Sequence, residues 1–476
     1  MTTDRTDLAF LGARQLAGLV RDRKVSPVEL TQLYLERIER LDGRFRAYIT
    51  ILPEAALASA RRAEASVMRG DALPALHGIP YAVKDQFDTA GVRTTCGSRI
   101  LEDNVPAADA TTIARLNAAG GILLGKLNLT EFALGGTQRF PFGQPRNPWN
   151  PDHDPGGSSS GSGIAVAAAL CAVSLGEDTG GSVRSPASFC GVVGLRPTWG
   201  RVSRHGSFPL CWSMDTPGPL GRTVEDAALL LRVIAGYDPN DPLTSHAPVP
   251  DYTQALGDGV RGLRVGIIRE LTFGADTEPE VRDAVVAAAR KLEGLGAATQ
   301  EVSLGLVPLA GAIFMALADA DGAGVHHHWL RARAADYDHG TRRRLLTASL
   351  IPSVIQQRAA RARALLRAEM LDLLERHDVL LCPTAHQAAP PIAAARAAIT
   401  TRHEAAGRFF TRRSYVTPAA LAGTPAIAVP CGFTRSGLPI SVQLIARRFD
   451  EATLLRVAHA YEQATDWSKR LPPDTA

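Results

Sequence analysis

Cysteine is scarce in this sequence of 476 residues. The six cysteines form no C-x-x-C pair and no cluster at the spacing of zinc ligands. A chain of this length buries a large hydrophobic core without disulfide bonds. The pattern therefore excludes a disulfide-stapled secreted protein and a zinc-ribbon protein, and it favours a reducing compartment. We expect a cytoplasmic protein without a metal site.

Long apolar runs are also missing. The longest run, residues 164–173, covers about half of the length that a membrane-spanning helix needs, so it is interpreted as a buried core helix. Asp4, Arg5 and Asp7 precede the first apolar residues, and this start does not predict a secretory signal. No membrane partner is expected.

The charges show no strong excess of either sign. Lysine and arginine number 52 and aspartate and glutamate 48, which gives a formal net charge of +4 without long runs of one sign. Proteins that bind mainly nucleic acid concentrate basic residues, so we expect no nucleic-acid partner. Apolar residues make up 45% of the chain, which is typical of a globular protein.

Helix and strand patterns alternate along most of the chain. Ser26, Pro27 and Glu29 stand at the N-cap, N1 and N3 positions of a helix that continues to about residue 42. Residues 78–83 form an apolar strand pattern that leads directly to Lys84. The alternation predicts an α/β fold with one large twisted mixed sheet, mostly parallel, covered by helices on both faces.

Residues 238–252 are the best candidate for a domain boundary, because they are polar and contain proline. We interpret them as a surface loop inside a single domain that spans residues 1–476. Residues 426–429 and 440–445 predict a hairpin around a Ser-Gly turn, and residues 451–463 a closing helix.

The centre of the chain carries two glycine-serine turns. The octet of residues 156–163 would be a flexible linker in isolation, but it runs straight into the apolar segment 164–173 and so must begin a buried helix. A second cluster follows at residues 177–186. Backbone N–H groups of two such turns can form a nest that stabilises an oxyanion on an attacked carbonyl.

Two other sequence motifs do not fit this chain. Residues 157–161 match G-x-S-x-G, but they lack the preceding strand that a nucleophile elbow needs. Residues 120–126 match the start of a P-loop, but Leu127 replaces its Ser or Thr. His326, His327 and His328 are adjacent and do not share one helix face, which favours a surface or interface role over metal binding.

The segment from Gly156 to Ser203 resembles the defining stretch of the amidase signature family. It contains Gly180-Gly181-Ser182-Val183-Arg184, and further matches at residues 78–85, 125–132, 215–219 and 421–425 follow in the family's order. The resemblance has its core at residues 78–220 and covers nearly the whole chain. Only about residues 300–375 look individual, and we expect this region to face the substrate.

The resemblance implies an amide hydrolase with a Lys, cis-Ser and Ser triad on Lys84, Ser158 and Ser182, the last being the nucleophile of an acyl-enzyme mechanism. It also implies a cis peptide bond before Ser158 and no metal or organic cofactor. A lysine that ends an apolar strand can act as a base only if burial lowers its pKa. The predicted oxyanion hole is formed by the backbone N–H groups of Thr179, Gly180, Gly181 and Ser182.

Other residues are expected to support this site. Asp178 and Arg184 flank the nucleophile and could anchor its turn, and Ser159 could cap the core helix or touch the triad. Phe208, Leu210 and Trp212 are proposed as pocket walls, which favours an aryl or hydrophobic acyl amide or carbamate as the small-molecule substrate.

Two functions remain open within the family. The glutaminase A subunit of a tRNA-dependent amidotransferase works with a partner protein, and it carries an aspartate eight positions before its Leu-Ala-Gly, which holds the glutamine amino group. Counting back from Leu421 gives Arg413, whose positive charge would repel that group. We therefore expect a stand-alone amidase, as a monomer or homodimer, and the alternative is the glutaminase subunit.

Overall fold

The computed structural model describes residues 8–393 and 399–475, and in this part of the chain eleven strands form one sheet. The strand order is β1-β3-β2-β4-β6-β5-β10-β11-β9-β7-β8. The strands are β1 (Tyr48–Ile51), β2 (Pro80–Lys84), β3 (Ile122–Leu127), β4 (Val173–Glu177), β5 (Val193–Arg196), β6 (Pro217–Gly221), β7 (Arg264–Ile268), β8 (Ala298–Val302), β9 (Val379–Pro383), β10 (Ala426–Phe433) and β11 (Pro439–Ala446).

The sheet is mixed, as predicted, but it is not mostly parallel. The pairs β2–β3, β2–β4, β7–β8 and β7–β9 are parallel. The other neighbouring pairs are antiparallel, and the predicted hairpin is β10–β11, which lies within the antiparallel run from β4 to β9. The prediction was wrong because helical patterns between strands suggested crossovers, whereas β4, β6 and β5 reverse direction along the sheet.

Helices surround this sheet. They are α2 (Ala13–Arg21), α3 (Pro27–Phe45), α4 (Pro53–Arg69), α5 (Thr111–Ala118), α6 (Ser160–Ala167), α7 (Arg184–Cys190), α8 (Val224–Ile234), α9 (Arg269–Thr272), α10 (Pro279–Gly294), α11 (Ala310–Val325), α12 (His327–Ala332), α13 (His339–Ala348), α14 (Ser353–Arg376), α16 (Arg402–Ala406), α17 (Arg412–Ser414), α18 (Thr417–Ala422) and α19 (Glu451–Gln463).

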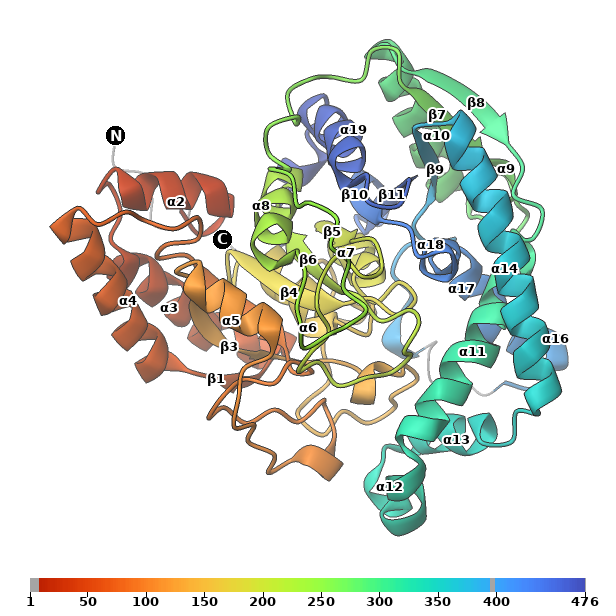
Figure 1. Ribbon diagram of the computed structural model, residues 1–476, viewed down its shortest axis with the longest axis horizontal. Coiled ribbons are helices and arrows are strands. Elements are labelled where there is room, and N and C mark those ends of the chain that lie inside the picture. Colours follow the sequence, from red (N-terminus) through yellow and green to blue (C-terminus); the bar gives the residue numbers. More distant parts are fainter. Residues whose placement is uncertain (1–7, 394–398, 476) are drawn as a thin grey trace.

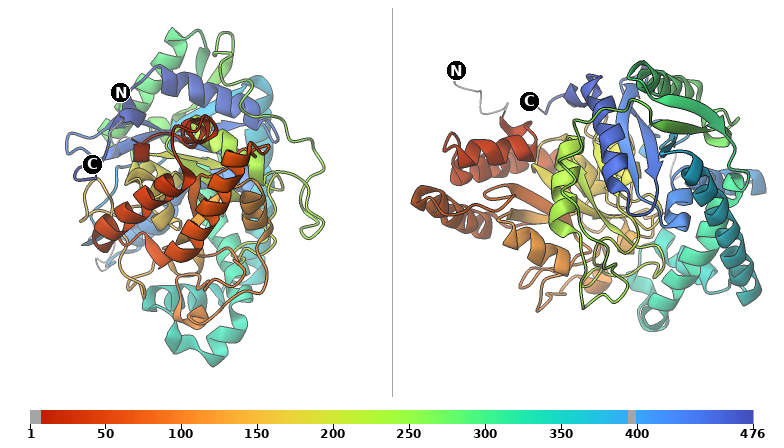
Figure 2. Two further views of the ribbon diagram at one scale, coloured as in Figure 1. Left: turned by 90° about the vertical axis from the view of Figure 1, so that its left-hand side faces the viewer. Right: turned by 45° about the horizontal axis from the view of Figure 1, so that its top comes forward.

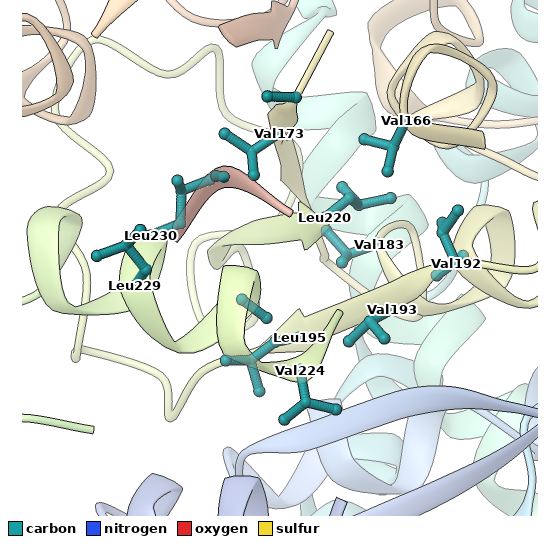
Figure 3. Packing of buried hydrophobic residues seen from close by; sticks show 14 of the residues in the cluster. Val166, Val173, Val183, Val192, Val193, Leu195, Leu220, Val224, Leu229 and Leu230 are labelled. Atoms are coloured by element: carbon teal, nitrogen blue, oxygen red, sulfur yellow. The ribbon is translucent and has the colours of Figure 1, made fainter. Parts of the chain in front are cut away.

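The helices cover the sheet from two sides (Figures 1 and 2). Helices α8, α10 and α19 contact the central strands β5, β6, β10 and β11, while α6 and α7 pack on each other and on β2, β4 and β5. Helices α3 and α4 lie at the β1 end of the sheet, and the long α14 lies at the opposite side of the molecule. Leu195 of β5 packs beside Val224 of α8 in the core between these layers (Figure 3).

Local sequence explains where the first helices begin. Ser26 Oγ accepts hydrogen bonds from the N–H groups of Val28 and Glu29, so the predicted capping box starts α3. The helix predicted for residues 164–173 is different. Helix α6 begins earlier, at Ser160, and ends at Ala167, because Ala169 adopts a left-handed φ of 50° and Arg37 binds the carbonyl groups of Ala168 and Ala169.

Within residues 8–393 and 399–475, one helical segment has the length and hydropathy of a membrane-spanning helix. It covers residues Val307–Val325 and includes α11, and half of it is buried inside the protein. Helix α11 packs against α13, α14 and α18. This packing is that of a core helix in a globular fold.

Candidate active site

Lys84 ends β2 inside the protein. All five residues of β2 are buried, because the strand pairs with β3 on one side and β4 on the other. The Lys84 side chain is fully buried, and its Nζ lies 2.7 Å from Ser158 Oγ. The structure therefore brings together two of the three residues of the predicted triad.

Ser158 belongs to the glycine-serine octet, which is packed rather than linker-like. Gly161 donates its N–H to the Asn128 carbonyl at 2.8 Å, and a Cβ at this position would lie only 2.3 Å from the Ala47 carbonyl oxygen. Glycine is therefore required for this close approach. The peptide bond between Gly157 and Ser158 is cis, as the resemblance implies.

Ser182 lies in the turn between β4 and α7. It is half-buried and lines the same cavity as Ser158, and its carbonyl accepts a hydrogen bond from the Ser159 N–H at 3.2 Å. A Cβ at the nearby Gly180 would lie 2.3 Å from the ring of Phe314. The second glycine-serine turn is thus shaped by close packing against α11.

The side chain of Ser159 joins the two turns instead of capping α6. Its Oγ donates to the Glu177 carbonyl and accepts from the Glu177 N–H, both at 3.3 Å. Helix α6 has no side-chain hydrogen bond at its N-cap. Of the two roles predicted for Ser159, capping is wrong, and the residue fixes the end of β4 next to the octet.

Asp178 anchors the turn that contains Ser182. Its carboxylate accepts hydrogen bonds from the N–H of Gly181 at 2.7 Å and from Arg184 Nε and Nη2 at 3.0 Å. Arg196 Nη1 lies 3.2 Å from the same carboxylate. Burial alone would raise the pKa of Asp178, but the two guanidinium groups outweigh it and hold the pKa well below its usual value.

One member of the predicted oxyanion hole does not fit the structure. Thr179, Gly180 and Ser182 line the cavity. The Gly181 N–H instead donates to Asp178 Oδ1, and Gly181 is not among the cavity-lining residues. The prediction for Gly181 therefore does not fit the geometry, because its donor is used to hold the turn.

Burial dominates the electrostatics of Lys84. Loss of hydration lowers its pKa, and the nearby carboxylates of Glu177, Asp215 and Asp178 oppose this effect. The direction is the one that a neutral amine base requires. Glu177 Oε2 lies 3.7 Å from Lys84 Nζ. Glu177 was not among the residues predicted for the site.

The cavity beside the two serines has a volume of about 250 Å³ and many polar residues in its wall. Of the three pocket residues predicted, Leu210 lines it. Phe208 packs instead on Phe132, with ring centroids 5.0 Å apart, and the 63% exposed Trp212 lies over Arg204. Those two predictions were wrong because the apolar character of a loop does not tell which of its side chains turn inward.

Two arginines and one aromatic residue line the cavity from distant segments. Phe314 and Arg344 come from the individual region of residues 300–375, and Arg413 comes from α17. Arg344 Nε lies 3.0 Å from Asp319 Oδ1, while its Nη1 is buried without a hydrogen-bond partner among the described residues. Arg344 was not predicted, because it is one of three consecutive arginines and the sequence does not distinguish it from the other two.

The surface role predicted for the histidine run is wrong for its first member. His326 is fully buried and packs against the ring of Phe132, and its Nδ1 lies 2.8 Å from the Tyr337 hydroxyl. His327 and His328 are exposed. The run divides because His326 ends the buried face of α11 and the next two residues begin α12.

A family model and curated relatives match nearly the whole chain. The Amidase family model matches residues 29–455. The A subunit of glutamyl-tRNA(Gln) amidotransferase from Roseiflexus sp. (strain RS-1) is 43% identical over 94% of this chain and 95% of the relative. The corresponding protein of Moorella thermoacetica is 41% identical over 98% and 99% of the two chains.

Solved structures share the fold over nearly the whole chain. A chain described under "An unexpected vestigial protein complex reveals the evolutionary origins of an s-triazine catabolic enzyme" superposes with a TM-score of 0.88 at 34% identity, covering 95% of this chain and 98% of the other. The A subunit of the Thermotoga maritima amidotransferase gives 0.81 at 34% identity, covering 96% and 95%. A bacterial aryl acylamidase of the amidase signature family gives 0.87 at 26% identity, covering 97% of each chain.

These findings correct the prediction about partners and confirm the prediction of the family. The relatives are named as A subunits of a glutamyl-tRNA(Gln) amidotransferase, so the exclusion of nucleic acid, which rested on the small net charge and the lack of long runs of one sign, is wrong. A stand-alone homodimer is likewise not what these relatives indicate. The chain belongs to the amidase signature family and is an amide hydrolase.

Proposed function

We propose that Lys84, Ser158 and Ser182 form the catalytic triad. Ser182 Oγ attacks the amide carbonyl and passes its proton to Ser158 Oγ, while the Ser158 proton moves to the neutral amine of Lys84. The observation that carries this proposal is the 2.7 Å contact of Lys84 Nζ with Ser158 Oγ at the wall of a cavity that Ser182 also lines.

The backbone N–H groups of Thr179, Gly180 and Ser182 would stabilise the oxyanion of the tetrahedral intermediate, and each such donor contributes about 3 kcal/mol in comparable sites. Ser158 returns a proton to the leaving amine, and water then hydrolyses the acyl-enzyme on Ser182. Hydrogen bonds of the supporting residues Ser159, Asp178 and Arg184 hold the two turns in place.

We further propose that the chain is the amide-hydrolysing component of a cytoplasmic protein complex, as the relatives named for an amidotransferase are, and that it releases ammonia from glutamine. This role is supported by identities of 40–43% that extend over nearly the whole length of each relative. It replaces the stand-alone aryl amidase, because Phe208 and Trp212, two of the three residues expected in its pocket wall, do not line the cavity.

Purified protein, alone and after co-purification with proteins from its own cells, would be assayed for ammonia release from glutamine. Anilides and neutral aliphatic amides serve as comparison substrates. Glutamine turnover that Ser182→Ala abolishes supports the proposal. Efficient turnover of anilides with none of glutamine would contradict it.

Arg413 favours a second candidate function. It lines the cavity together with Arg344. Among the described lining residues the acidic one is Asp154, and its carboxylate accepts a hydrogen bond from the Gly156 N–H. Arg344 is also paired with Asp319, but its Nη1 has no hydrogen-bond partner among the described residues, so the two guanidinium groups at this small cavity favour a carboxylate over an ammonium group. The second candidate is therefore hydrolysis of a small amide whose acyl part carries a negative charge without an amino group.

Glutamine and 4-carbamoylbutanoate, which is glutamine without its amino group, separate the two candidates. The anionic-amide function predicts a higher kcat/KM for 4-carbamoylbutanoate, and it predicts that Arg413→Asp shifts the ratio toward glutamine by about tenfold or more. A wild-type preference for glutamine that Arg413→Asp leaves unchanged would remove this candidate.

A further inference from the structure

A buried glutamate that the proposed mechanism does not use lies beside the proposed base. Glu177 ends β4, as Lys84 ends the parallel neighbour β2, so both side chains emerge at the same edge of the sheet. Glu177 Oε2 lies 3.7 Å from Lys84 Nζ, and the exposures of the two side chains are 1% and 0%. A buried carboxylate is costly unless it is paired, so this placement calls for a role.

Local contacts hold the Glu177 carboxylate toward the lysine. Its Oε1 accepts a hydrogen bond from the Thr216 N–H at 3.2 Å and lies 3.1 Å from Thr179 Oγ1. The backbone N–H and carbonyl of Glu177 are both bonded to Ser159 Oγ, and its carbonyl also lies 3.5 Å from Lys84 Nζ. The side chain is thereby oriented from three segments of the chain.

Other charged and titratable groups near this pair already have partners of their own. Asp215 accepts hydrogen bonds from the N–H groups of Leu210 and Cys211 and from Thr179 Oγ1. Asp178 is paired with Arg184 and Arg196, and the Cys96 thiol, whose pKa burial raises, is neutral. Among the residues that the structure describes, Glu177 is the one whose carboxylate forms an ion pair with the lysine amine.

We propose that Glu177 is a positioning residue that sets the proton affinity of Lys84. The inference rests on the proposed triad. When Ser182 attacks, its proton moves to Ser158 Oγ, and Ser158 gives its own proton to Lys84 Nζ. The ammonium group that results lies 3.7 Å from the Glu177 carboxylate. The carboxylate stabilises this buried cation in place of water.

The proposal predicts the direction in which Glu177 shifts the pKa of Lys84. Burial lowers the pKa of Lys84, and the negative charge of Glu177 raises it again. Burial and the neighbouring Asp215 raise the pKa of Glu177 to about 7, and the positive charge of Lys84 opposes this rise. Removing the charge with Glu177→Gln must lower the pKa of Lys84, by about one to three pH units for an opposite charge at this distance.

The test measures how fast phenylmethylsulfonyl fluoride labels Ser182 as a function of pH, which requires no knowledge of the substrate. In the wild type the rate rises with pH as Lys84 loses its proton. In Glu177→Gln we expect this rise to move to lower pH by about one to three units, with a lower plateau because the amine is a weaker base. Glu177→Asp keeps the charge, and its rise should lie between the two.

The outcomes separate this inference from the proposed triad. If the wild type is labelled as slowly as Ser182→Ala, the triad itself is wrong. If Ser182 is labelled and Glu177→Gln shows a reduced plateau with an unmoved pH profile, Glu177 is only structural and the inference is overturned. Should Glu177→Gln fail to fold, Glu177→Asp decides the matter, because its carboxylate is drawn away from Nζ and an unmoved profile contradicts the role.

Discussion

Asp178→Asn is the strongest test of the buried charges that hold the turn containing Ser182. The carboxylate accepts hydrogen bonds from the N–H groups of Gly181 and Val183 and pairs with Arg184 and Arg196, and all three charged side chains are fully buried. The variant leaves two guanidinium groups without their counter-charge. Breaking a buried pair costs about 3–5 kcal/mol, so the free energy of unfolding should fall by that amount at pH 7.

The assay is urea denaturation followed by circular dichroism at several pH values. The two arginines hold the pKa of Asp178 below its value in the unfolded chain, which is about 3.9. The carboxylate therefore stabilises the fold fully above that pH and loses its effect as the pH falls toward the folded pKa. The difference between wild type and variant should shrink below about pH 4.

Asp283→Asn is the matched control, because the Asp283 side chain is 69% exposed and pairs only with its neighbour Arg282 on the surface of α10, among the residues that the structure describes. Its urea midpoint should equal that of the wild type. An Asp178→Asn variant as stable as this control at pH 7 would refute the electrostatic argument.

Three further results are expected. Ser182→Ala should lower kcat by at least about 1000-fold while the urea midpoint stays unchanged, since one half-buried hydroxyl contributes little stability; a residual rate within about tenfold would exclude Ser182 as nucleophile. In the wild type, kcat/KM should rise with pH as Lys84, whose pKa burial lowers, becomes neutral, and a flat profile would remove Lys84 as base. Gly180→Ala places a Cβ 2.3 Å from the Phe314 ring and should lower both activity and thermal stability, whereas Gly257→Ala, with open space around it, should change neither.

Local patterns predicted well where a short segment determines its own structure. The capping box at Ser26 begins α3, and the apolar strand before Lys84 is β2. The mixed α/β sheet followed from the alternation of patterns, and the octet was placed in the interior because an apolar segment follows it. The association of Lys84, Ser158 and Ser182 came from the family resemblance, since residues 74 and 24 positions apart cannot be joined by periodicity.

Features that depend on distant segments were not predictable. The direction of β4 and β6 depends on which strands they pair with, and the position of Phe208 depends on Phe132 and Trp329 being present to receive its ring. Arg344 faces the cavity only because α13 packs against α11. Asp178 was expected to anchor the turn of Ser182, but its use of the Gly181 N–H was not foreseen, because the orientation of one backbone donor depends on the folded turn.

The central claim is that buried Lys84 activates Ser182 through Ser158. Mass-spectrometric mapping of the site that phenylmethylsulfonyl fluoride modifies, in the wild type and in Lys84→Ala, tests it most directly. The account predicts a single adduct on Ser182 in the wild type and labelling that is at least about 100-fold slower in the variant. An adduct on another residue, or equal labelling of Ser182 in the two proteins, would contradict it.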